Sequence, residues 1–233
     1  MTSLVAAQVG IAGRLDPTDL KVGAGEFVAL VGPNGGGKTS LLRALARVEH
    51  ASGTVLIGGE NIDAASPARR RHLLSFLPAS RDFAWPIAAR DVIALGLDRP
   101  DPARISELIE LLELASLADR PINQLSTVER ARVLTARALV GNPQILLLDE
   151  PLSNLDPYWV LQLITILETI AQSGQAVLVA LHDLAQLRHF SRALLIADGK
   201  VQMDEAPADL MASERFGEIF RIRAADGGWA IKC

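Results

Sequence analysis

Residues 32–39 read Gly-Pro-Asn-Gly-Gly-Gly-Lys-Thr, a spacing of glycines, lysine and hydroxyl that is typical of a phosphate-binding loop. They follow an apolar run at 27–31 and precede a helical pattern at 40–48. Glycines let backbone N–H groups turn toward a phosphate, and the positive end of the following helix adds to the attraction. Lys38 is expected to reach the β- and γ-phosphates, and Thr39 to offer its hydroxyl to Mg²⁺. The predicted site for a nucleoside triphosphate consists of Gly32, Pro33, Asn34, Gly35, Gly36, Gly37, Lys38, Thr39 and Ser40.

Two adjacent carboxylates end a second apolar run. Residues 145–148 are Ile-Leu-Leu-Leu, and Asp149 and Glu150 follow directly. Sheets of α/β proteins bind ligands at the carboxyl ends of their strands, so these acids are well placed for chemistry. Asp149 is expected to hold Mg²⁺ through its water shell, and Glu150 to polarise a water for in-line attack on the γ-phosphate. The alternative is that both acids are simply solvated where the strand ends.

A histidine occupies the corresponding position after a third apolar run. His182 follows residues 176–181 and is itself followed by Asp183. Taken alone, a histidine at such a position is more often structural than catalytic. Beside two other strand ends that carry phosphate chemistry, His182 is expected to contact the γ-phosphate. The predicted catalytic residues are therefore Lys38, Glu150 and His182.

The elements that must position these residues alternate between strands and helices. The three apolar runs are short and nearly continuous, as in strands of a parallel sheet that helices cover on both faces. Leucine and isoleucine recur at helical spacing in residues 105–112 and 160–167. Residues 193–196 read as a further strand, and Asp198 and Gly199 as the hairpin turn after it. The predicted fold class is α/β with a mostly parallel sheet.

The predicted organisation is a single domain with an insertion. Residues 79–139 contain no comparable strand run and read as a loop followed by helices, so we expect an inserted helical subdomain there. Residues 1–78 and 140–233 are expected to form the nucleotide-binding core. The opening stretch, MTSLVAAQVGIAG, lacks the basic segment of a signal peptide and reads as an edge strand. We expect it to belong to a set of antiparallel N-terminal strands.

Composition narrows the class of protein. The 233 residues carry 23 Lys and Arg against 27 Asp and Glu, and a formal net charge of −4 argues against a nucleic-acid partner. No run approaches the roughly 18 apolar residues of a transmembrane helix. The sole cysteine, Cys233, leaves no internal disulfide and no cysteine-based metal site. These features predict a cytoplasmic protein.

Taken in order, the motifs resemble those of the ATP-binding cassette (ABC) ATPases. The resemblance covers essentially the whole chain. It rests on the phosphate loop and on residues 149–151 (Asp-Glu-Pro), 153–156 (Ser-Asn-Leu-Asp) and 181–183 (Leu-His-Asp). Within the family, the chain is most similar to the nucleotide-binding subunits of importers for iron-siderophores, haem or cobalamin.

The resemblance implies a P-loop NTPase fold and an ATPase that takes ATP and Mg²⁺. It also implies a head-to-tail dimer in which each site combines the phosphate loop of one protomer with the signature of the other. In that scheme Ser126 contacts the nucleotide and Asp156 belongs to the loop that crosses the interface. Closure on ATP would drive a transmembrane permease from the cytoplasmic face of the cell membrane. Both a homodimer and a heterodimer with another ABC ATPase stay open.

The signature departs from the family pattern. Where the family has Leu-Ser-Gly-Gly-Gln, residues 125–129 read Leu-Ser-Thr-Val-Glu. Ser126 and Glu129 have the spacing of a capping box, and the N–H groups of the helix it opens would still point at the opposite site. Thr127 and Val128 bring β-branched bulk where glycine permits close approach. We therefore expect weakened hydrolysis more than its loss.

Other family positions are also altered. Ala79 stands where the family has a glutamine that helps coordinate Mg²⁺ and the attacking water, and a methyl group supplies neither contact. Residues 1–26 lack the aromatic on which the family stacks adenine, and Arg14 is the candidate to stack its guanidinium on the base instead. Phe83 and Trp85 lie in the loop that contacts the membrane partner in the family. They either anchor that interface or pack the inserted helices onto the core.

Two functions of different class follow. The first is the energy-coupling ATPase subunit of a membrane importer for an iron chelate, haem or cobalamin. The second is an ATP-binding but poorly hydrolysing regulatory or pairing subunit that needs a cassette with an intact signature. The phosphate loop and the strand-end acids favour retained chemistry, whereas the altered signature and Ala79 favour attenuation.

Overall fold

The fold is built around a six-stranded, mostly parallel sheet. The computed structural model describes residues 2–80, 85–225 and 228–231. The strand order is β10-β9-β3-β8-β7-β6, and every neighbouring pair is parallel except β9 with β10. The predicted α/β class is thereby confirmed. The strands of this sheet are β3 (Phe27–Val31), β6 (Leu74–Leu77), β7 (Ile145–Asp149), β8 (Ala176–Ala180), β9 (Arg192–Ala197) and β10 (Lys200–Glu205).

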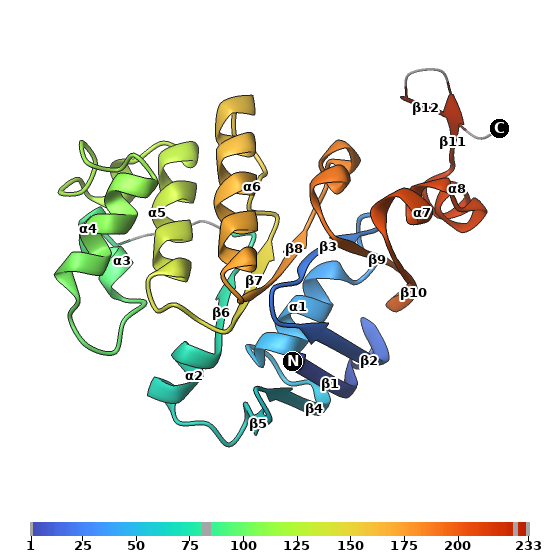
Figure 1. Cartoon of the computed structure of the whole chain (residues 1–233), viewed down its shortest axis with the longest axis horizontal. Coiled ribbons are helices and arrows are strands. Elements are labelled where there is room, and N and C mark those ends of the chain that lie inside the picture. Colours follow the sequence, from blue (N-terminus) through green and yellow to red (C-terminus); the bar gives the residue numbers. More distant parts are fainter. Residues whose placement is uncertain (1, 81–84, 226–227, 232–233) are drawn as a thin grey trace.

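The alternation of side chains along the central strands supplies two apolar cores, one on each face of the sheet. Val28 belongs to the core that includes α1 (Lys38–Ala46), whereas its neighbour Ala29 belongs to the core that includes α6 (Pro157–Gln172) (Figure 1). Helix α1 begins two residues before the start expected from the sequence, directly after the glycine run. The strand end and the helix start that hold the phosphate loop are thus both anchored by buried apolar contacts.

A second, four-stranded antiparallel sheet covers the other side of α1. Its order is β2-β1-β4-β5, and Leu4 in this sheet shares a core with Leu41 and Leu45 of α1. This sheet confirms the expected antiparallel N-terminal strands. Its members are β1 (Thr2–Ile11), β2 (Leu15–Gly23), β4 (Ser52–Ile57) and β5 (Glu60–Asn61).

Helices cover about half of the described residues between β6 and β7. Within that described part, the β-type pairing is limited to one isolated bridge between Ala88 and Pro121. Val92, Leu108 and Val133 join these helices to the core around α6. The proposed division at 79–139 stays a prediction. The helices are α3 (Ala89–Ala94), α4 (Pro102–Leu111), η1 (Ile122–Gln124) and α5 (Thr127–Leu139); α2 (Pro67–Leu73) precedes β6.

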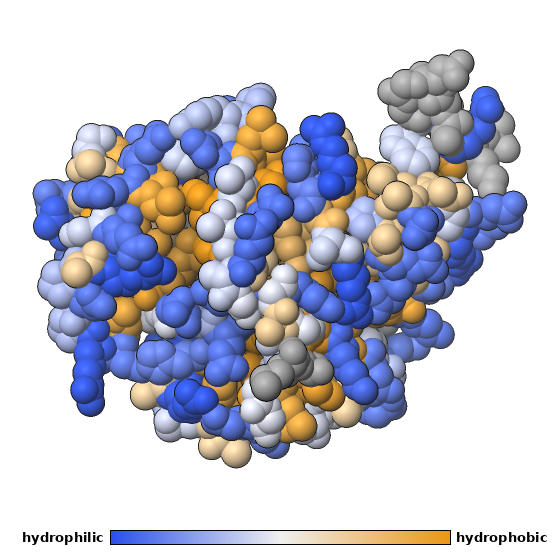
Figure 2. Space-filling model, viewed as in Figure 1, coloured by the Kyte–Doolittle hydropathy of each residue, from blue (hydrophilic) through white to orange (hydrophobic). Residues whose placement is uncertain are grey.

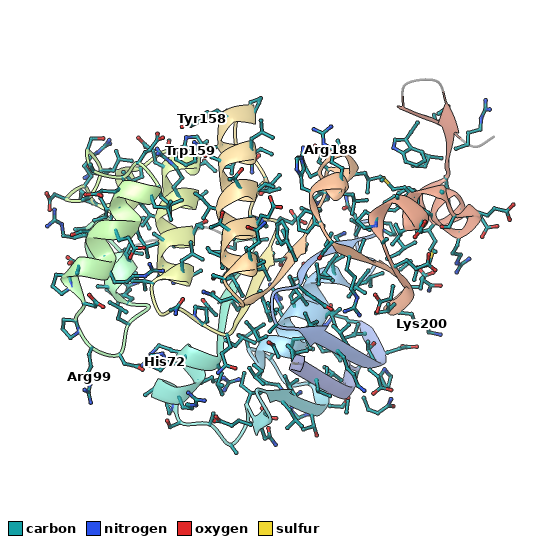
Figure 3. The ribbon with its side chains drawn as sticks, in the orientation of Figure 1. His72, Arg99, Tyr158, Trp159, Arg188 and Lys200 are labelled. Carbon is teal, nitrogen blue, oxygen red and sulfur yellow. The ribbon has the colours of Figure 1, made fainter. Side chains whose placement is uncertain are left out.

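Helix α5 is tied to the first turn of α6 by one arginine. The guanidinium of Arg132 lies 4.3 Å from the centroid of the Trp159 ring. It also donates to the carbonyl oxygens of Leu112 and Glu113, each at 3.1 Å. The Tyr158 hydroxyl donates to Glu113 Oε1 at 2.7 Å. Figure 3 shows Tyr158 and Trp159 at the end of α6 that lies beside α5.

After β10, helix α7 packs against β9 and β10. None of the described residues after β10 adds a strand to the six-stranded sheet. Figure 2 shows hydrophilic side chains over much of one face of the molecule, with apolar ones visible between them. Within the described ranges, every helix is too short or too polar to cross a membrane. The remaining elements are η2 (Leu184–His189), α7 (Pro207–Ala212), α8 (Glu214–Phe220), β11 (Ile222–Ala225) and β12 (Gly228–Ile231).

Candidate functional site

The loop between β3 and α1 is shaped by glycines at positions that no other residue fits. Gly32 has a φ of 153°, and a Cβ added there would lie 1.9 Å from the carbonyl oxygen of Ile196. Gly37, at φ 115°, is the N-cap of α1, and its lack of a side chain leaves the start of the helix without a side-chain cap. The first-turn N–H groups of α1 therefore stay available to a phosphate.

Lys38 lies inside this loop, with 6% of its surface exposed. Its Nζ donates to the carbonyl oxygens of Gly32 at 2.7 Å and of Pro33 at 3.2 Å. Burial lowers the pKa of this ammonium, and the nearby carboxylates of Glu150 and Asp149 partly offset that effect. The Lys38 ammonium is thus held against the backbone of the loop, near the carboxylates of Glu150 and Asp149.

Thr39 and Asp149 are brought together by the packing of α1 against β7. The Thr39 hydroxyl donates to Asp149 Oδ1 at 3.1 Å, and Asp149 Oδ2 is buried without a hydrogen-bond partner of good geometry among the described residues. Burial raises the pKa of Asp149; the Thr39 bond and the amide of Ala79 act in the opposite direction. A hydroxyl and a buried carboxylate oxygen without a partner are donors that suit Mg²⁺.

Glu150 and His182 meet because β7 and β8 are neighbouring parallel strands. His182 Nε2 lies 2.9 Å from Glu150 Oε1. Glu150 has a φ of 53°, and its N–H donates to the carbonyl oxygen of Ala180 at 3.2 Å. Glu150 lines the same cavity as residues 34–40 of the phosphate loop and the start of α1. The structure therefore places His182 beside Glu150 at neighbouring strand ends, as predicted.

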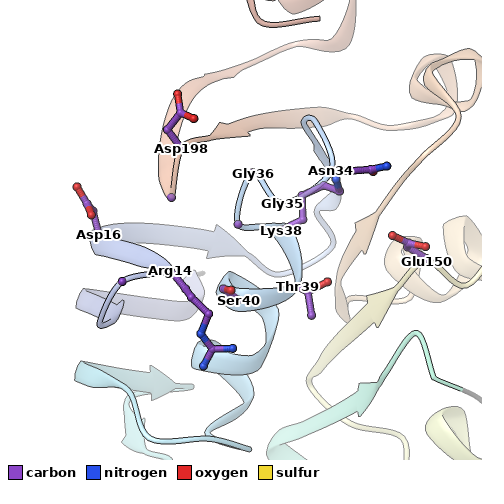
Figure 4. Close-up of a pocket in the computed structure, with 13 residues that line it drawn as sticks. Arg14, Asp16, Asn34, Gly35, Gly36, Lys38, Thr39, Ser40, Glu150 and Asp198 are labelled. Carbon is purple, nitrogen blue, oxygen red and sulfur yellow. The ribbon is translucent and has the colours of Figure 1, made fainter.

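Lys38, Thr39 and Glu150 line one cavity of about 560 Å³ together with the glycines of the phosphate loop (Figure 4). The predicted site residues Gly32, Pro33, Asp149 and His182 are not among its lining residues. Its wall on one side is the turn at Asp198 and Gly199, and the Gly199 N–H donates to the carbonyl oxygen of Gly36 at 3.0 Å. The sequence predicted this turn as a hairpin but gave no sign that it borders the site, because the contact depends on the tertiary fold. The lining residues are Gly13, Arg14, Asp16, Asn34, Gly35, Gly36, Gly37, Lys38, Thr39, Ser40, Glu150, Asp198 and Gly199.

The sequence profile of the ABC transporter family matches residues 15–153, more than half of the chain. The chain belongs to the ABC transporter family. It is the ATP-binding subunit of an ABC transporter and an ATPase. The predicted family resemblance is confirmed.

Curated ABC relatives match over nearly the whole chain. The hemin import ATP-binding protein HmuV of Streptomyces coelicolor is 36% identical over 225 residues, which cover 91% of this chain and 80% of the relative. The petrobactin import ATP-binding protein FpuC of Bacillus anthracis is 30% identical over 222 residues, with 90% and 82% covered. The cobalamin import ATP-binding protein BtuD of Halobacterium salinarum is 31% identical, with 91% of this chain and 56% of that protein covered.

Solved ABC structures have the same fold. A bacterial Atm1-family ABC exporter with ATP bound aligns with a TM-score of 0.82 at 25% identity, covering 94% of this chain and 41% of the exporter. The dimeric, post-hydrolysis ATP-binding cassette MJ0796, bound to ADP and phosphate, aligns with a TM-score of 0.77 at 26% identity. That alignment covers 89% of this chain and 99% of the cassette. The P-loop NTPase architecture is thereby confirmed.

Ser126 and Asp156 were also predicted to bind the nucleotide, but in this ABC subunit they do not line the cavity and cap helices instead. Ser126 begins α5 and forms a complete capping box: its Oγ accepts from the Glu129 N–H at 3.2 Å, and Glu129 Oε2 accepts from the Ser126 N–H at 2.7 Å. Asp156 begins α6, and its Oδ1 accepts from the Trp159 N–H at 3.1 Å. Their roles toward a second protomer stay predictions.

Other positions singled out in the sequence differ in where the structure places them. Ala79 is exposed just after β6, and Trp85 is 72% exposed. Phe83 lies outside the described residues. Arg14 lines the cavity and forms an ion pair with Glu49 at 3.0 Å.

Proposed function

We propose that this chain hydrolyses ATP to drive the import of an iron chelate, haem or cobalamin through a transmembrane permease. The observation that carries the proposal is the similarity to a hemin import ATP-binding protein over 91% of this chain. Relatives named for petrobactin and cobalamin import broaden the substrate class to metal chelates with large organic ligands. The chain would act on the cytoplasmic face of the membrane, where ATP is available.

The cavity supports hydrolysis by positioning and charge. The N–H groups of the phosphate loop and the Lys38 ammonium bind the β- and γ-phosphates. Glu150 accepts a proton from a water whose oxygen bonds to the γ-phosphorus, while the bond from that phosphorus to the bridging oxygen breaks. His182 Nε2, 2.9 Å from Glu150 Oε1, orients that carboxylate and would contact the γ-phosphate.

A divalent cation fits the donors at the end of β7. Thr39 and Asp149 would hold Mg²⁺, because the hydroxyl and the buried carboxylate oxygens already converge there. When bound, Mg²⁺ neutralises charge on the β- and γ-phosphate oxygens. Ser40, in the first turn of α1, also lines the cavity and lies between Thr39 and Arg14 in Figure 4.

The full site requires a second protomer. Ser126 and Asp156 lie outside the cavity of their own chain, so they contribute only if α5 and the start of α6 face the cavity of a partner. A head-to-tail dimer provides that arrangement. The partner is a second copy or another ABC ATPase, and the permease docks on the dimer.

Transport by a reconstituted complex tests this function. The tagged chain is co-expressed with candidate importer permeases, and a complex that co-purifies is placed in proteoliposomes with ATP on the side of the ATPase. We expect accumulation of haem, a ferric siderophore or cyanocobalamin that falls about 100-fold with Glu150→Gln. ATP hydrolysis without accumulation of any of the three would contradict the proposed substrate class.

A second candidate function is suggested by the start of α5. Thr127 and Val128 carry branched side chains in the first turn, and two N–H groups there are already bonded within the capping box. Such a helix start suits a subunit that binds ATP but depends on a partner with an intact signature. Turnover that appears only when an ABC ATPase with a Gly-Gly signature is added would favour this alternative over a homodimeric motor.

A further inference from the structure

One polar side chain of the phosphate loop still has its hydrogen-bonding groups available. Asn34, Lys38, Thr39 and Ser40 line the cavity together with Glu150. Lys38 donates to two carbonyl oxygens of the loop, and Thr39 donates to the carboxylate at the end of β7. Ser40 lies on the far side of Thr39 from Glu150 in Figure 4. The Asn34 amide group has no hydrogen bond to another described residue.

Asn34 is carried on a tight turn that fixes the direction of its side chain. The Gly36 N–H donates to the carbonyl oxygen of Pro33 at 3.0 Å, and Lys38 Nζ donates to the same oxygen at 3.2 Å. Figure 4 shows the Asn34 side chain extending from this turn toward the side of the cavity on which Glu150 lies. The phosphate loop and β7 therefore present an amide and a carboxylate to the same space.

A water that attacks phosphorus in line needs two acceptors for its two O–H bonds, because one of its lone pairs must point at the phosphorus. Glu150 supplies one acceptor and takes the proton. An amide carbonyl can supply the other without gaining or losing a proton. Ala79 offers no such group: it is exposed just after β6, its side chain is a methyl group, and it is not among the residues that line the cavity.

We propose that Asn34 is a further catalytic residue, whose carbonyl oxygen orients the attacking water in the place of a glutamine at position 79. The water oxygen bonds to the γ-phosphorus, the bond from phosphorus to the bridging oxygen breaks, and one proton passes to Glu150. The second O–H of the water donates to Asn34 Oδ1 and stays intact. This role rests on the proposed hydrolysis, in which Glu150 is the base.

Asn34→Ala tests the proposal in the purified full chain with ATP and Mg²⁺. Asn34 is not among the residues with positive φ, so alanine can adopt its backbone without strain. We expect phosphate release to slow about 100-fold, the cost of a misplaced reactant. The affinity for ADP, measured by calorimetry, should stay within about twofold, because ADP has no γ-phosphate to be attacked. Asn34→Ser keeps a shorter acceptor and should recover about tenfold of the lost rate.

A double-mutant cycle with Ala79→Gln separates this chemical role from a structural one. Position 79 is close to the magnesium donors, since the backbone amide of Ala79 lowers the pKa of Asp149. A glutamine there brings a second amide group toward the cavity. Alone, Ala79→Gln should change turnover by less than about twofold, whereas in the Asn34→Ala background it should restore about tenfold.

Asn61→Ala is the matched control. Asn61 is an exposed asparagine on β5 that lies outside the cavity, and its Oδ1 accepts from the Asp63 N–H at 2.9 Å. This variant should release phosphate and bind ADP like the parent.

Three results would overturn the proposal. Unchanged turnover in Asn34→Ala would remove Asn34 from the reaction. Equal losses of turnover and of ADP affinity would make it a residue of the loop fold or of nucleotide binding alone. Effects of Asn34→Ala and Ala79→Gln that simply add would show that the two positions do not share one task. Unchanged turnover in Glu150→Gln would instead overturn the proposed hydrolysis itself, whatever the Asn34 variants do.

Discussion

Two helix starts in this molecule carry the same dipole and use it differently. Helix α1 begins after Gly37 without a side-chain cap, and its first-turn N–H groups lie at the wall of the cavity. Helix α5 begins at Ser126, and its own Ser126 and Glu129 satisfy two N–H groups. The first start is open to an outside anion, whereas the second is closed by its own side chains.

The comparison shows how local stability and ligand binding compete for the same backbone groups. A capping box stabilises the helix in the absence of any ligand, because no orphan donor waits for a partner. An uncapped start is less stable because its N–H groups have no partner. A phosphate that bonds to these groups stabilises the helix start, and this gain adds to the affinity for the ligand. In this chain the catalytic side keeps the open form, and the side expected to face a partner has the closed form.

The largest effect should follow from Glu150→Gln. This change removes the proposed base at the open start but keeps the shape and hydrogen bonds of the side chain. We expect ATP turnover to fall about 10²–10⁴-fold while ATP affinity stays within about twofold. Phosphate release and calorimetry measure the two quantities. Equal phosphate release by variant and parent would remove Glu150 from this role.

Lys38→Ala should weaken ATP binding by about 100-fold. It deletes the ammonium that lies inside the loop, which is worth about two charged hydrogen bonds to phosphate. Calorimetry with ATP and Mg²⁺ gives the affinity. Lys21→Ala is a suitable control, because Lys21 is an exposed lysine on β2 that lies outside the cavity. An unchanged ATP affinity in Lys38→Ala would contradict the assignment of residues 32–39 as the phosphate-binding loop.

Opening the second start should raise turnover. Thr127→Gly with Val128→Gly removes the branched side chains, so a phosphate from a partner can approach the α5 N–H groups more closely. We expect about a tenfold gain in steady-state ATPase rate. Glycine also costs about 1 kcal/mol per helical position, so the double variant should be less stable in urea. A lower stability with an unchanged rate would show that the bulk at α5 does not limit hydrolysis.

The smallest effects concern two carboxyls with opposite pKa shifts. The backbone N–H of Ser126 lowers the pKa of Glu129, whereas burial raises the pKa of Asp149. Ionised Glu129 therefore adds stability above its unfolded-state pKa, and this stability is lost as the pH falls through the folded-state pKa. Ionised Asp149 removes stability: its penalty grows as the pH rises from the unfolded-state pKa and is complete above the folded-state pKa.

At pH 7 we accordingly expect opposite signs from two neutral replacements. Glu129→Gln should lower the free energy of unfolding by about 0.5 kcal/mol, and Asp149→Asn should raise it by about 1 kcal/mol. Urea denaturation at pH 7 and at about pH 3.5 measures both, and both differences should shrink at the acidic pH. Two changes of the same sign at pH 7 would contradict the opposite pKa shifts of Glu129 and Asp149.

Much of the site could be predicted from the sequence because its chemistry is local. The glycine spacing around Lys38 and the acids after a run of leucines indicate a function before any fold is known. The boundary of α1 was two residues off because Gly37 gives no capping signal in the sequence. Asp16 and Asp198 could not be assigned to the cavity, since they reach it only through the packing of separate hairpins on the phosphate loop.

The contact between Arg132 and Trp159 links the start of α5 to the start of α6, so the two starts should move together. Ser126 lies at one start and Asp156 at the other, and the stacked guanidinium bridges the two helices within two turns of both caps. We therefore expect a displacement of α5 to move the first turn of α6 as well. If a second protomer docks on these two caps, as proposed above, it should meet Ser126 and Asp156 as one rigid surface.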